Sequence, residues 1–193
     1  MTTVKLSFSI LDAWAKGNWE QAVSYYLGKP FPPTPAMELG RLKHQIWERQ
    51  IKQSQCLPQE LGGELLESPV LEQKYEKLIP FSDDIVILLR GVPDCSDDYS
   101  DGVAIHEFKC GMTTAKTYID SLQLDYYKLL LPQANIGYYH CYNPYFDRMT
   151  RGIKYLSDKN GRAALEHIIS NAGEMIDYLQ SQKLLINFDR SKR

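Results

Sequence analysis

The stretch 91–109, GVPDCSDDYSDGVAIHEFK, places acidic and basic side chains at the ends of two predicted strands. Asp94 directly follows an apolar run, and Glu107 and Lys109 close the next one. Positions i and i+2 of a strand face the same way, so Glu107 and Lys109 project together while Phe108 points into the opposite layer. An antiparallel turn between the two strands brings Asp94 beside them. The stretch therefore predicts a cluster of two carboxylates and one ammonium group.

Two close carboxylates repel each other, and one is pushed towards protonation unless a cation lies between them. Oxygen ligands and retained waters suit Mg²⁺ or Mn²⁺ better than Zn²⁺. Such an ion polarises a phosphate, lowers the pKa of a bound water and neutralises charge in the transition state. Lys109 then positions the attacking water or stabilises negative charge. The spacing alone is equally compatible with a solvated Glu/Lys pair and an aspartate in a turn.

The order of predicted elements is helix, three strands, helix, strand and a final helix. This order indicates an α/β protein with a central mixed β-sheet flanked by helices. The length of 193 residues fits a single domain over 1–193. Within it we expect N-terminal helices in 1–55, the sheet core in 70–157 and a C-terminal helix over 161–182.

Apolar periodicity and Gly, Pro and Ser/Thr boundaries predict the individual elements. In chain order these are one or two helices at 9–27, a helix at 37–55, strands at 70–80, 84–92 and 102–109, a helix at 114–131 capped by Thr113 or Thr114, strands at 135–142 and 150–156, and a helix at 161–182. The prolines in residues 29–35 predict an extended connector, and the acidic residues 95–101 predict a turn.

His44 lies on one face of the predicted helix 37–55, at helical spacing from Gly40, Trp47 and Ile51. Gly40 is expected to let this face approach another backbone closely. A lone histidine on such a face is more often a satisfied core residue than a ligand. His44 therefore becomes a site residue only if its helix packs over the carboxylates.

Gln123 and Tyr127 stand four residues apart and share a face of the predicted helix 114–131. There they can hydrogen-bond a phosphate or the lysine, and Tyr127 can stack on a base. An ordinary amphipathic helix margin explains the same pattern without any ligand. His106, inside a predicted buried strand, has no assigned role.

Charge and composition limit the classes of function. The net charge of −2 gives no global attraction to nucleic acid, so a DNA-binding surface has to be local. Two basic clusters are candidates, although each is equally well a solvated surface: Arg41, Lys43, Arg49 and Lys52, and Arg148, Arg151, Lys154, Lys159 and Arg162.

No apolar run approaches the roughly 20 residues of a membrane span, and residues 1–9 lack the build of a signal peptide, so we expect a soluble cytoplasmic protein without membrane contact. The cysteines lack metal-knuckle spacing and are expected to be reduced thiols.

Taken in chain order, these residues resemble the RecB-like branch of the PD-(D/E)XK nuclease superfamily. The matched stretches are Leu6-Ser7-Phe8-Ser9 for S-x-S, Gly40-Arg41-Leu42-Lys43-His44 for G-x-x-x-H, Gly91-Val92-Pro93-Asp94 for G-x-x-D, Glu107-Phe108-Lys109 for (D/E)-x-K, and Gln123-Leu124-Asp125-Tyr126-Tyr127 for Q-x-x-x-Y. Each motif is common by chance, but five in family order are not. The resemblance covers roughly residues 6–142.

The resemblance implies a role for each matched position and a metal-dependent deoxyribonuclease activity. Mg²⁺ or Mn²⁺ is the implied ion, and its ligands would be His44, Asp94, Glu107 and the backbone carbonyl of Phe108. Lys109 would be the catalytic lysine beside the catalytic carboxylates. Gln123 and Tyr127 would hold the DNA strand or brace the site.

The implied partner is DNA, with single-stranded or frayed ends preferred, and the implied setting is DNA repair, recombination or processing of phage and mobile-element DNA. No cysteine follows Cys141, so the iron–sulfur cluster of some relatives is not expected. No G-x-x-x-x-G-K-[ST] loop is present, so any motor would come from a helicase or recombination partner protein.

Two other interpretations remain open at this point. One is a catalytically silent module of the same fold that binds DNA or a protein partner. The other is an unrelated α/β enzyme that binds a metal through the acidic residues Asp97, Asp98 and Asp101.

Overall fold

The computed structural model describes residues 1–29 and 31–186, so Pro30 of the predicted connector and residues 187–193 lie outside the described part. The helices are α1 (Phe8–Ala15), α2 (Trp19–Tyr26), α3 (Pro35–Ser54), α4 (Ala115–Ile119), α5 (Gln123–Leu130) and α6 (Asp158–Ser181), with a short 3-10 helix, η1, at Gln59–Leu61. The strands are β1 (Thr2–Ser7), β2 (Pro69–Leu71), β3 (Tyr75–Pro80), β4 (Ile85–Gly91), β5 (Cys95–Tyr99), β6 (Gly102–Cys110), β7 (Ala134–Asn143) and β8 (Arg148–Tyr155).

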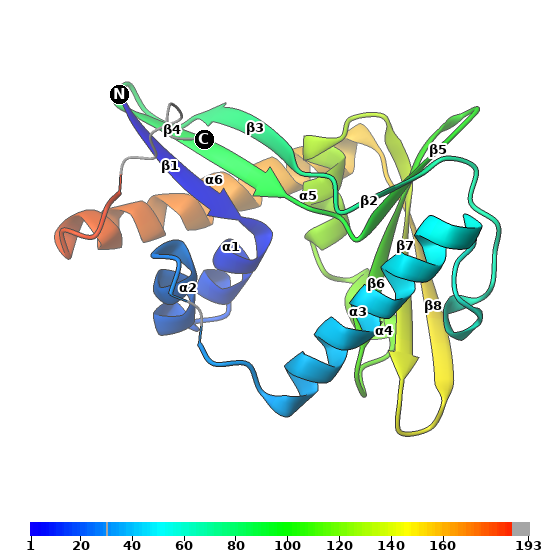
Figure 1. Cartoon of the computed structure of the whole chain (residues 1–193). Coiled ribbons are helices and arrows are strands. Elements are labelled where there is room, and N and C mark those ends of the chain that lie inside the picture. Colours follow the sequence, from blue (N-terminus) through cyan, green and yellow to red (C-terminus); the bar gives the residue numbers. More distant parts are fainter. Residues whose placement is uncertain (30, 187–193) are drawn as a thin grey trace.

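The strands form two mixed sheets flanked by helices, which confirms the α/β fold class (Figure 1). The smaller sheet has the order β1-β4-β3, and the larger has the order β2-β5-β6-β7-β8. The expectations of one central sheet and of one strand at 70–80 are therefore wrong. Glu72 adopts a left-handed φ of 49° just after β2, and the turn in the backbone sends β2 and β3 into different sheets.

The three-stranded sheet packs against α1 and α6. β1 runs parallel to β4, while β3 and β4 form the predicted antiparallel hairpin. Val4 and Leu6 of β1 are buried in a core cluster with Ile168 and Met175 of α6. β1 is not predicted from the sequence, because its period-two pattern covers only Val4 and Leu6.

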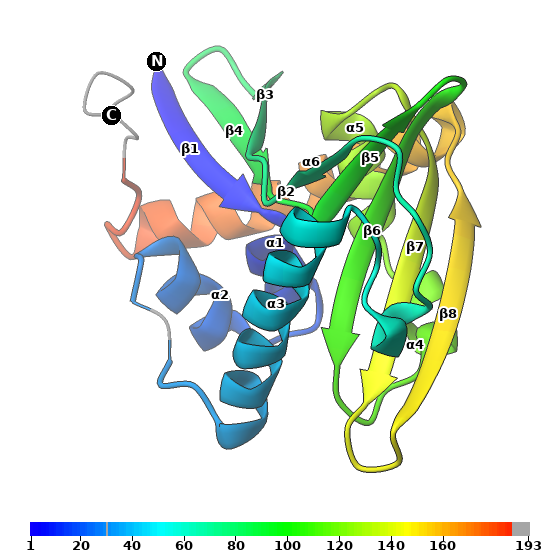
Figure 2. The ribbon, with the colours of Figure 1, turned by 45° about the vertical axis from the view of Figure 1, so that its right-hand side comes forward.

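The five-stranded sheet is covered on both faces (Figure 2). α3 packs on one face, where Trp47 contacts Phe108 of β6. α4 and α5 cover the other face, where Leu124 and Tyr139 share a core cluster. β5 and β6 are antiparallel, β6 and β7 are parallel, and β7 and β8 form an antiparallel hairpin.

The segment expected to be an acidic turn is mostly the strand β5, so that expectation is wrong. Asp97 points inward and is 7% exposed. Its carboxylate accepts the backbone N–H of Glu67 at 3.2 Å and of Ser68 at 2.6 Å. These hydrogen bonds explain an acidic residue in a strand, because they hold the preceding loop against the sheet edge.

The prediction of a single helix at 114–131 is also wrong, since α4 and α5 are separate helices. Between them, Ser121 Oγ accepts the backbone N–H of Gln123 at 3.2 Å. A serine that bonds nearby backbone competes with the helical hydrogen-bond ladder. The interruption places Gln123 in the first turn of α5, facing the sheet.

The bounds of the other predicted elements are confirmed to within a few residues. The helix predicted at 37–55 is α3, and the helix predicted at 161–182 is α6. Ser157 and Asn160 form a capping box at the start of α6. The cysteines are free thiols, as expected. Within residues 1–29 and 31–186, no helix is both long and apolar enough to cross a membrane.

His106 and His140 form a buried pair between neighbouring strands. His140 Nδ1 lies 3.2 Å from the carbonyl oxygen of Leu61 and therefore carries the proton of that bond. His140 Nε2 then accepts from His106 Nδ1 at 3.0 Å, which leaves His106 Nε2 buried without a partner among the described residues. Burial, aided by the positive charge of Arg151, lowers the pKa of His106 to about 3 and of His140 to about 4.

Both imidazoles are neutral in the folded chain, whereas histidines in an unfolded chain titrate near pH 6.5. Below that pH the unfolded chain binds more protons, so the free energy of unfolding falls as the pH drops from about 6.5 towards about 4. We expect a slope of up to about 1.4 kcal/mol per pH unit for each histidine. Urea unfolding over this range measures the slope. The double variant His106→Phe/His140→Gln should lose most of it, and an unchanged slope would contradict the assignment.

Candidate active site

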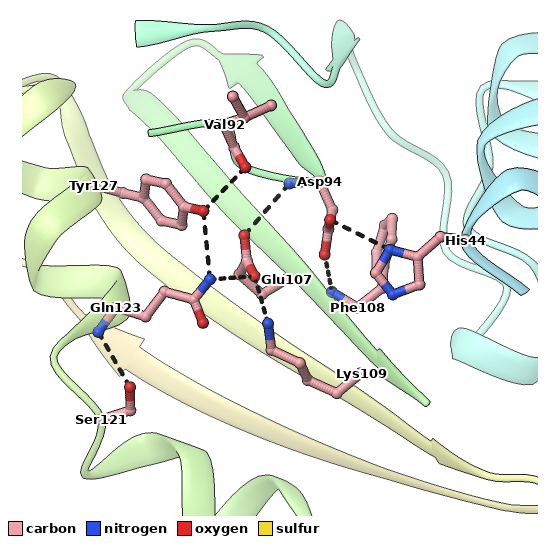
Figure 3. Close-up of polar contacts among 9 residues, drawn as sticks. All are labelled: His44, Val92, Asp94, Glu107, Phe108, Lys109, Ser121, Gln123 and Tyr127. Carbon is pink, nitrogen blue, oxygen red and sulfur yellow. Dashed lines mark hydrogen bonds and ion pairs between the residues drawn. The ribbon is translucent and has the colours of Figure 1, made fainter. Parts of the chain in front are cut away.

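The carboxylate of Asp94 joins three distant stretches of the chain (Figure 3). Its Oδ2 accepts the backbone N–H of Phe108 on β6 at 2.7 Å. Its Oδ1 lies 3.4 Å from Nδ1 of His44 on α3. The backbone N–H of Asp94 itself donates to Oε1 of Glu107 at 3.4 Å. The β5–β6 hairpin thus brings Asp94 beside Glu107, as the sequence predicts.

Glu107 is the most deeply buried member of the cluster, with 2% of its surface exposed. Its Oε2 accepts from Lys109 Nζ at 2.8 Å and from Gln123 Nε2 at 2.7 Å. The predicted common direction of Glu107 and Lys109 is confirmed by this contact. Phe108 points to the other face and packs on Trp47.

Gln123 and Tyr127 brace the cluster from α5. Gln123 Nε2 contacts both Glu107 and the hydroxyl of Tyr127, the latter at 3.4 Å. The Tyr127 hydroxyl donates to the carbonyl oxygen of Val92 at 3.0 Å. One helix face therefore fixes both Glu107 and the backbone that leads into Asp94 (Figure 3).

α3 is anchored so that His44 faces Asp94. Trp47 and Ile51 are fully buried, and Trp47 Nε1 donates to Oε2 of Glu60 at 2.7 Å. Lys43 Nζ forms an ion pair with the same carboxylate at 2.9 Å. The condition set for His44, that its helix packs over the carboxylates, is met. The close backbone approach expected at Gly40 is wrong, because a Cβ there would meet nothing within 4 Å.

The charges of the cluster shift each other's pKa values. Burial disfavours the charged form of His44, but the hydrogen bond to Asp94 and its negative charge prevail, so the pKa of His44 is raised. Burial, followed by the charge of Asp94, raises the pKa of Glu107. Burial acts against charged Lys109, but the charges of Glu107 and Asp94 raise its pKa above the ordinary value. Lys109 is therefore held as a cation beside a carboxylate pair.

A cleft of about 770 Å³ opens beside the cluster, between the N-terminal half of α3 and the end of β6. His44 and Lys109 line it, together with two glutamates that the sequence prediction missed, Glu48 and Glu72. Burial, then the hydrogen bond to Glu72 and its charge, raises the pKa of Glu48. Glu48 lies one helical turn after His44, so helical spacing could have predicted that it lines the same cleft. The sequence contains no such indication for Glu72, because its position depends on the left-handed turn after β2.

The donor set fits Mg²⁺ or Mn²⁺ in kind: two carboxylates, an imidazole and a strand carbonyl. The charge conflict between Asp94 and Glu107, visible in the raised pKa of Glu107, is the kind that a divalent cation relieves. In the described part of the chain, no three His, Cys, Asp or Glu side chains are gathered tightly enough to hold an ion as they stand. The oxygens of Glu107 are instead engaged by Lys109, Gln123 and the Asp94 N–H.

Part of the predicted basic surface is neutralised by ion pairs. Lys43 pairs with Glu60, Arg151 with Glu64, and Lys154 with Asp125. Two arginines line hollows instead: Arg41 in the cleft beside His44 and Lys109, and Arg148 in a second hollow beside the β7–β8 hairpin.

No family model and no curated protein matches the sequence. Solved structures do match. The alkaline exonuclease of Laribacter hongkongensis in complex with dAMP gives a TM-score of 0.54 at 13% identity, over 93% of this chain and 91% of that one. A provisionally assigned exonuclease from Eubacterium rectale gives a TM-score of 0.57 at 11% identity, over 98% of this chain and 86% of that one. The chain therefore has the fold of these exonuclease structures.

Gly91 of the G-x-x-D motif is required by packing. A Cβ there would lie 2.6 Å from Leu130 Cδ1 and 2.9 Å from the Tyr127 ring, so Gly91→Ala should displace the brace. We expect a loss of about 1–3 kcal/mol in the free energy of unfolding. Gly40→Ala is the matched control, because open space and a helical backbone predict a gain of about 1 kcal/mol. Urea unfolding measures the free energy of unfolding of both variants. If the two substitutions change it in the same direction, this explanation is refuted.

Proposed function

We propose that the chain is a Mg²⁺- or Mn²⁺-dependent nuclease that hydrolyses DNA phosphodiester bonds, and that it belongs to the RecB-like branch of the PD-(D/E)XK superfamily. The observation that carries the proposal is the convergence of His44, Asp94, Glu107 and Lys109 at the edge of one open cleft. The exonuclease-like fold supports it. The dAMP in one similar structure favours DNA as the substrate.

His44, Asp94, Glu107 and the carbonyl of Phe108 would hold the ion. Bound there, it would supply a water of lowered pKa and neutralise charge on the phosphate. Asp94 orients its neighbours, since it fixes both the Phe108 backbone and the His44 ring.

Lys109 reaches from buried Glu107 into the cleft and stays protonated, so it stabilises negative charge on the scissile phosphate. Gln123 and Tyr127 keep the Glu107 carboxylate in one orientation. We further propose single-stranded or frayed DNA ends as substrate. A role in DNA repair, recombination or phage and mobile-element DNA processing, alongside a helicase or recombination protein, is part of the same proposal.

Lys109→Ala and Asp94→Asn are expected to reduce Mn²⁺-dependent cleavage of end-labelled DNA by at least about 100-fold. The first removes the positive charge that would stabilise the phosphate, and the second removes the charge of a proposed metal ligand. Lys116→Ala and Asp98→Asn are the matched controls, since both residues are exposed and lie outside the cluster. Product length on a gel separates end-trimming from internal cutting. Loss of cleavage in Asp98→Asn with full activity in Asp94→Asn would favour the acidic strand as the metal site instead.

Metal binding to the folded chain alone should stabilise it, by about 2.7 kcal/mol at a concentration of 100 times Kd. We expect Mn²⁺ to raise the melting temperature of the wild-type chain, and Glu107→Gln to show a much smaller rise because one ligand has lost its charge. Differential scanning calorimetry with and without Mn²⁺ measures the effect. A catalytically silent module, the alternative function, predicts no metal-dependent rise in either protein.

A further inference from the structure

A second hollow of about 480 Å³ lies between the start of α4 and the β7–β8 hairpin. The loop between β7 and β8 is at the same end of the large sheet as the end of β6 (Figure 2). Its lining combines one aromatic ring, one guanidinium group and several hydroxyls, from Phe146, Arg148, Thr113, Thr114 and Thr150.

This hollow adjoins the catalytic cleft. Lys109, which lines the cleft, pairs in register with Cys141, which lines the hollow. Neighbouring strands are about 4.8 Å apart, so the two spaces are separated by little more than one strand. Cys110 lines the cleft and Met112, two residues later, lines the hollow.

The tip of the hairpin carries two exposed aromatic rings on a backbone that hydrogen bonds hold in place. Phe146 is 77% exposed, and Tyr145 is 69% exposed. The backbone N–H groups of Tyr145 and Phe146 donate to Asn143 Oδ1, at 3.0 and 3.3 Å respectively. Tyr142 donates its hydroxyl to Asp147 Oδ1 at 2.9 Å. An exposed ring on an ordered backbone offers a face on which an unpaired base can stack.

The charge of the hollow favours a phosphate beside that base. No carboxylate is among its lining residues, and Arg148 is exposed with no ion pair to another residue of the described chain. The neighbouring carboxylate of Asp147 is turned towards Tyr142. Arginine and threonine hydroxyls are common phosphate contacts.

We propose that the hollow binds one unpaired base of the DNA strand that occupies the catalytic cleft, with Phe146 stacked on the base and Arg148 on an adjacent phosphate. This inference rests on the proposed nuclease function and assigns its substrate selectivity to the β7–β8 hairpin. A paired base is held in the duplex by its hydrogen bonds to the opposite strand and cannot turn into the hollow, so the hollow discriminates single strands and frayed ends from blunt duplex.

Binding of a fluorescein-labelled oligothymidylate by the full chain in EDTA tests the proposal without cleavage. Phe146→Ala should weaken binding about tenfold, and Phe146→Trp should restore it. Arg148→Ala should weaken binding and reduce the slope of log K against log salt by about 1. Tyr155→Ala and Lys29→Ala, which remove an exposed aromatic ring and an exposed positive charge outside the hollow and outside both basic clusters, should bind like the wild type. A blunt hairpin duplex should bind Phe146→Ala and wild type equally.

The outcomes separate this inference from the nuclease proposal. The inference is overturned if Phe146→Ala binds the single strand as tightly as the wild type does, or if it loses as much affinity for blunt duplex as for the single strand. Neither result contradicts the nuclease proposal. No binding of the oligothymidylate by the wild type overturns it as well. The nuclease proposal is tested separately with Mn²⁺ and bis(p-nitrophenyl) phosphate, an ester too small to reach the hollow. Wild type, Phe146→Ala and Arg148→Ala should hydrolyse this ester at equal rates. If none of the three proteins hydrolyses the ester and none cleaves DNA, the nuclease proposal is contradicted, whatever the result of the binding experiment.

Discussion

The carboxylate of Asp94 is the contact on which the arrangement of the site depends. One oxygen holds the backbone of β6 at Phe108, and the other faces the imidazole of His44. Because these partners belong to a strand and to a helix on one face of the large sheet, Asp94 fixes their relative position. The remaining side chains of the cluster are arranged around this junction, and α5 closes it from the opposite face through Gln123 and Tyr127.

The junction also concentrates charge where water is scarce. Glu107 is buried and faces the negative charge of Asp94, yet Lys109 and Gln123 supply donors to its carboxylate. A buried carboxylate that is fully hydrogen-bonded costs far less than an isolated one. The same arrangement keeps a cation, Lys109, at the wall of an open cleft, where it meets a solvent-borne anion. Stability and the proposed chemistry therefore use the same hydrogen bonds.

Local pattern was sufficient for the parts of the site that lie within one element. The common direction of Glu107 and Lys109 follows from strand periodicity, and the shared face of Gln123 and Tyr127 follows from helical spacing. The contact of His44 with Asp94 depends on how Trp47 and Glu60 anchor α3, which no local pattern contains. The left-handed turn at Glu72, which divides the sheet and brings this glutamate into the cleft, is likewise a tertiary result. The buried pair of His106 and His140 required knowledge of which strands are neighbours.

The attachment of α3 has a mechanical consequence. The helix is fastened between Lys43 and Ile51, and His44 lies within that fastened span. The preceding two turns, with Met37 and Gly40, form the outer wall of the cleft, and the Thr34 hydroxyl caps their first turn. At about 1.5 Å per residue they project about 12 Å beyond the fastening. Because His44 lies within the fastened span, a small tilt of these two turns would change the width of the cleft far more than it would move the imidazole.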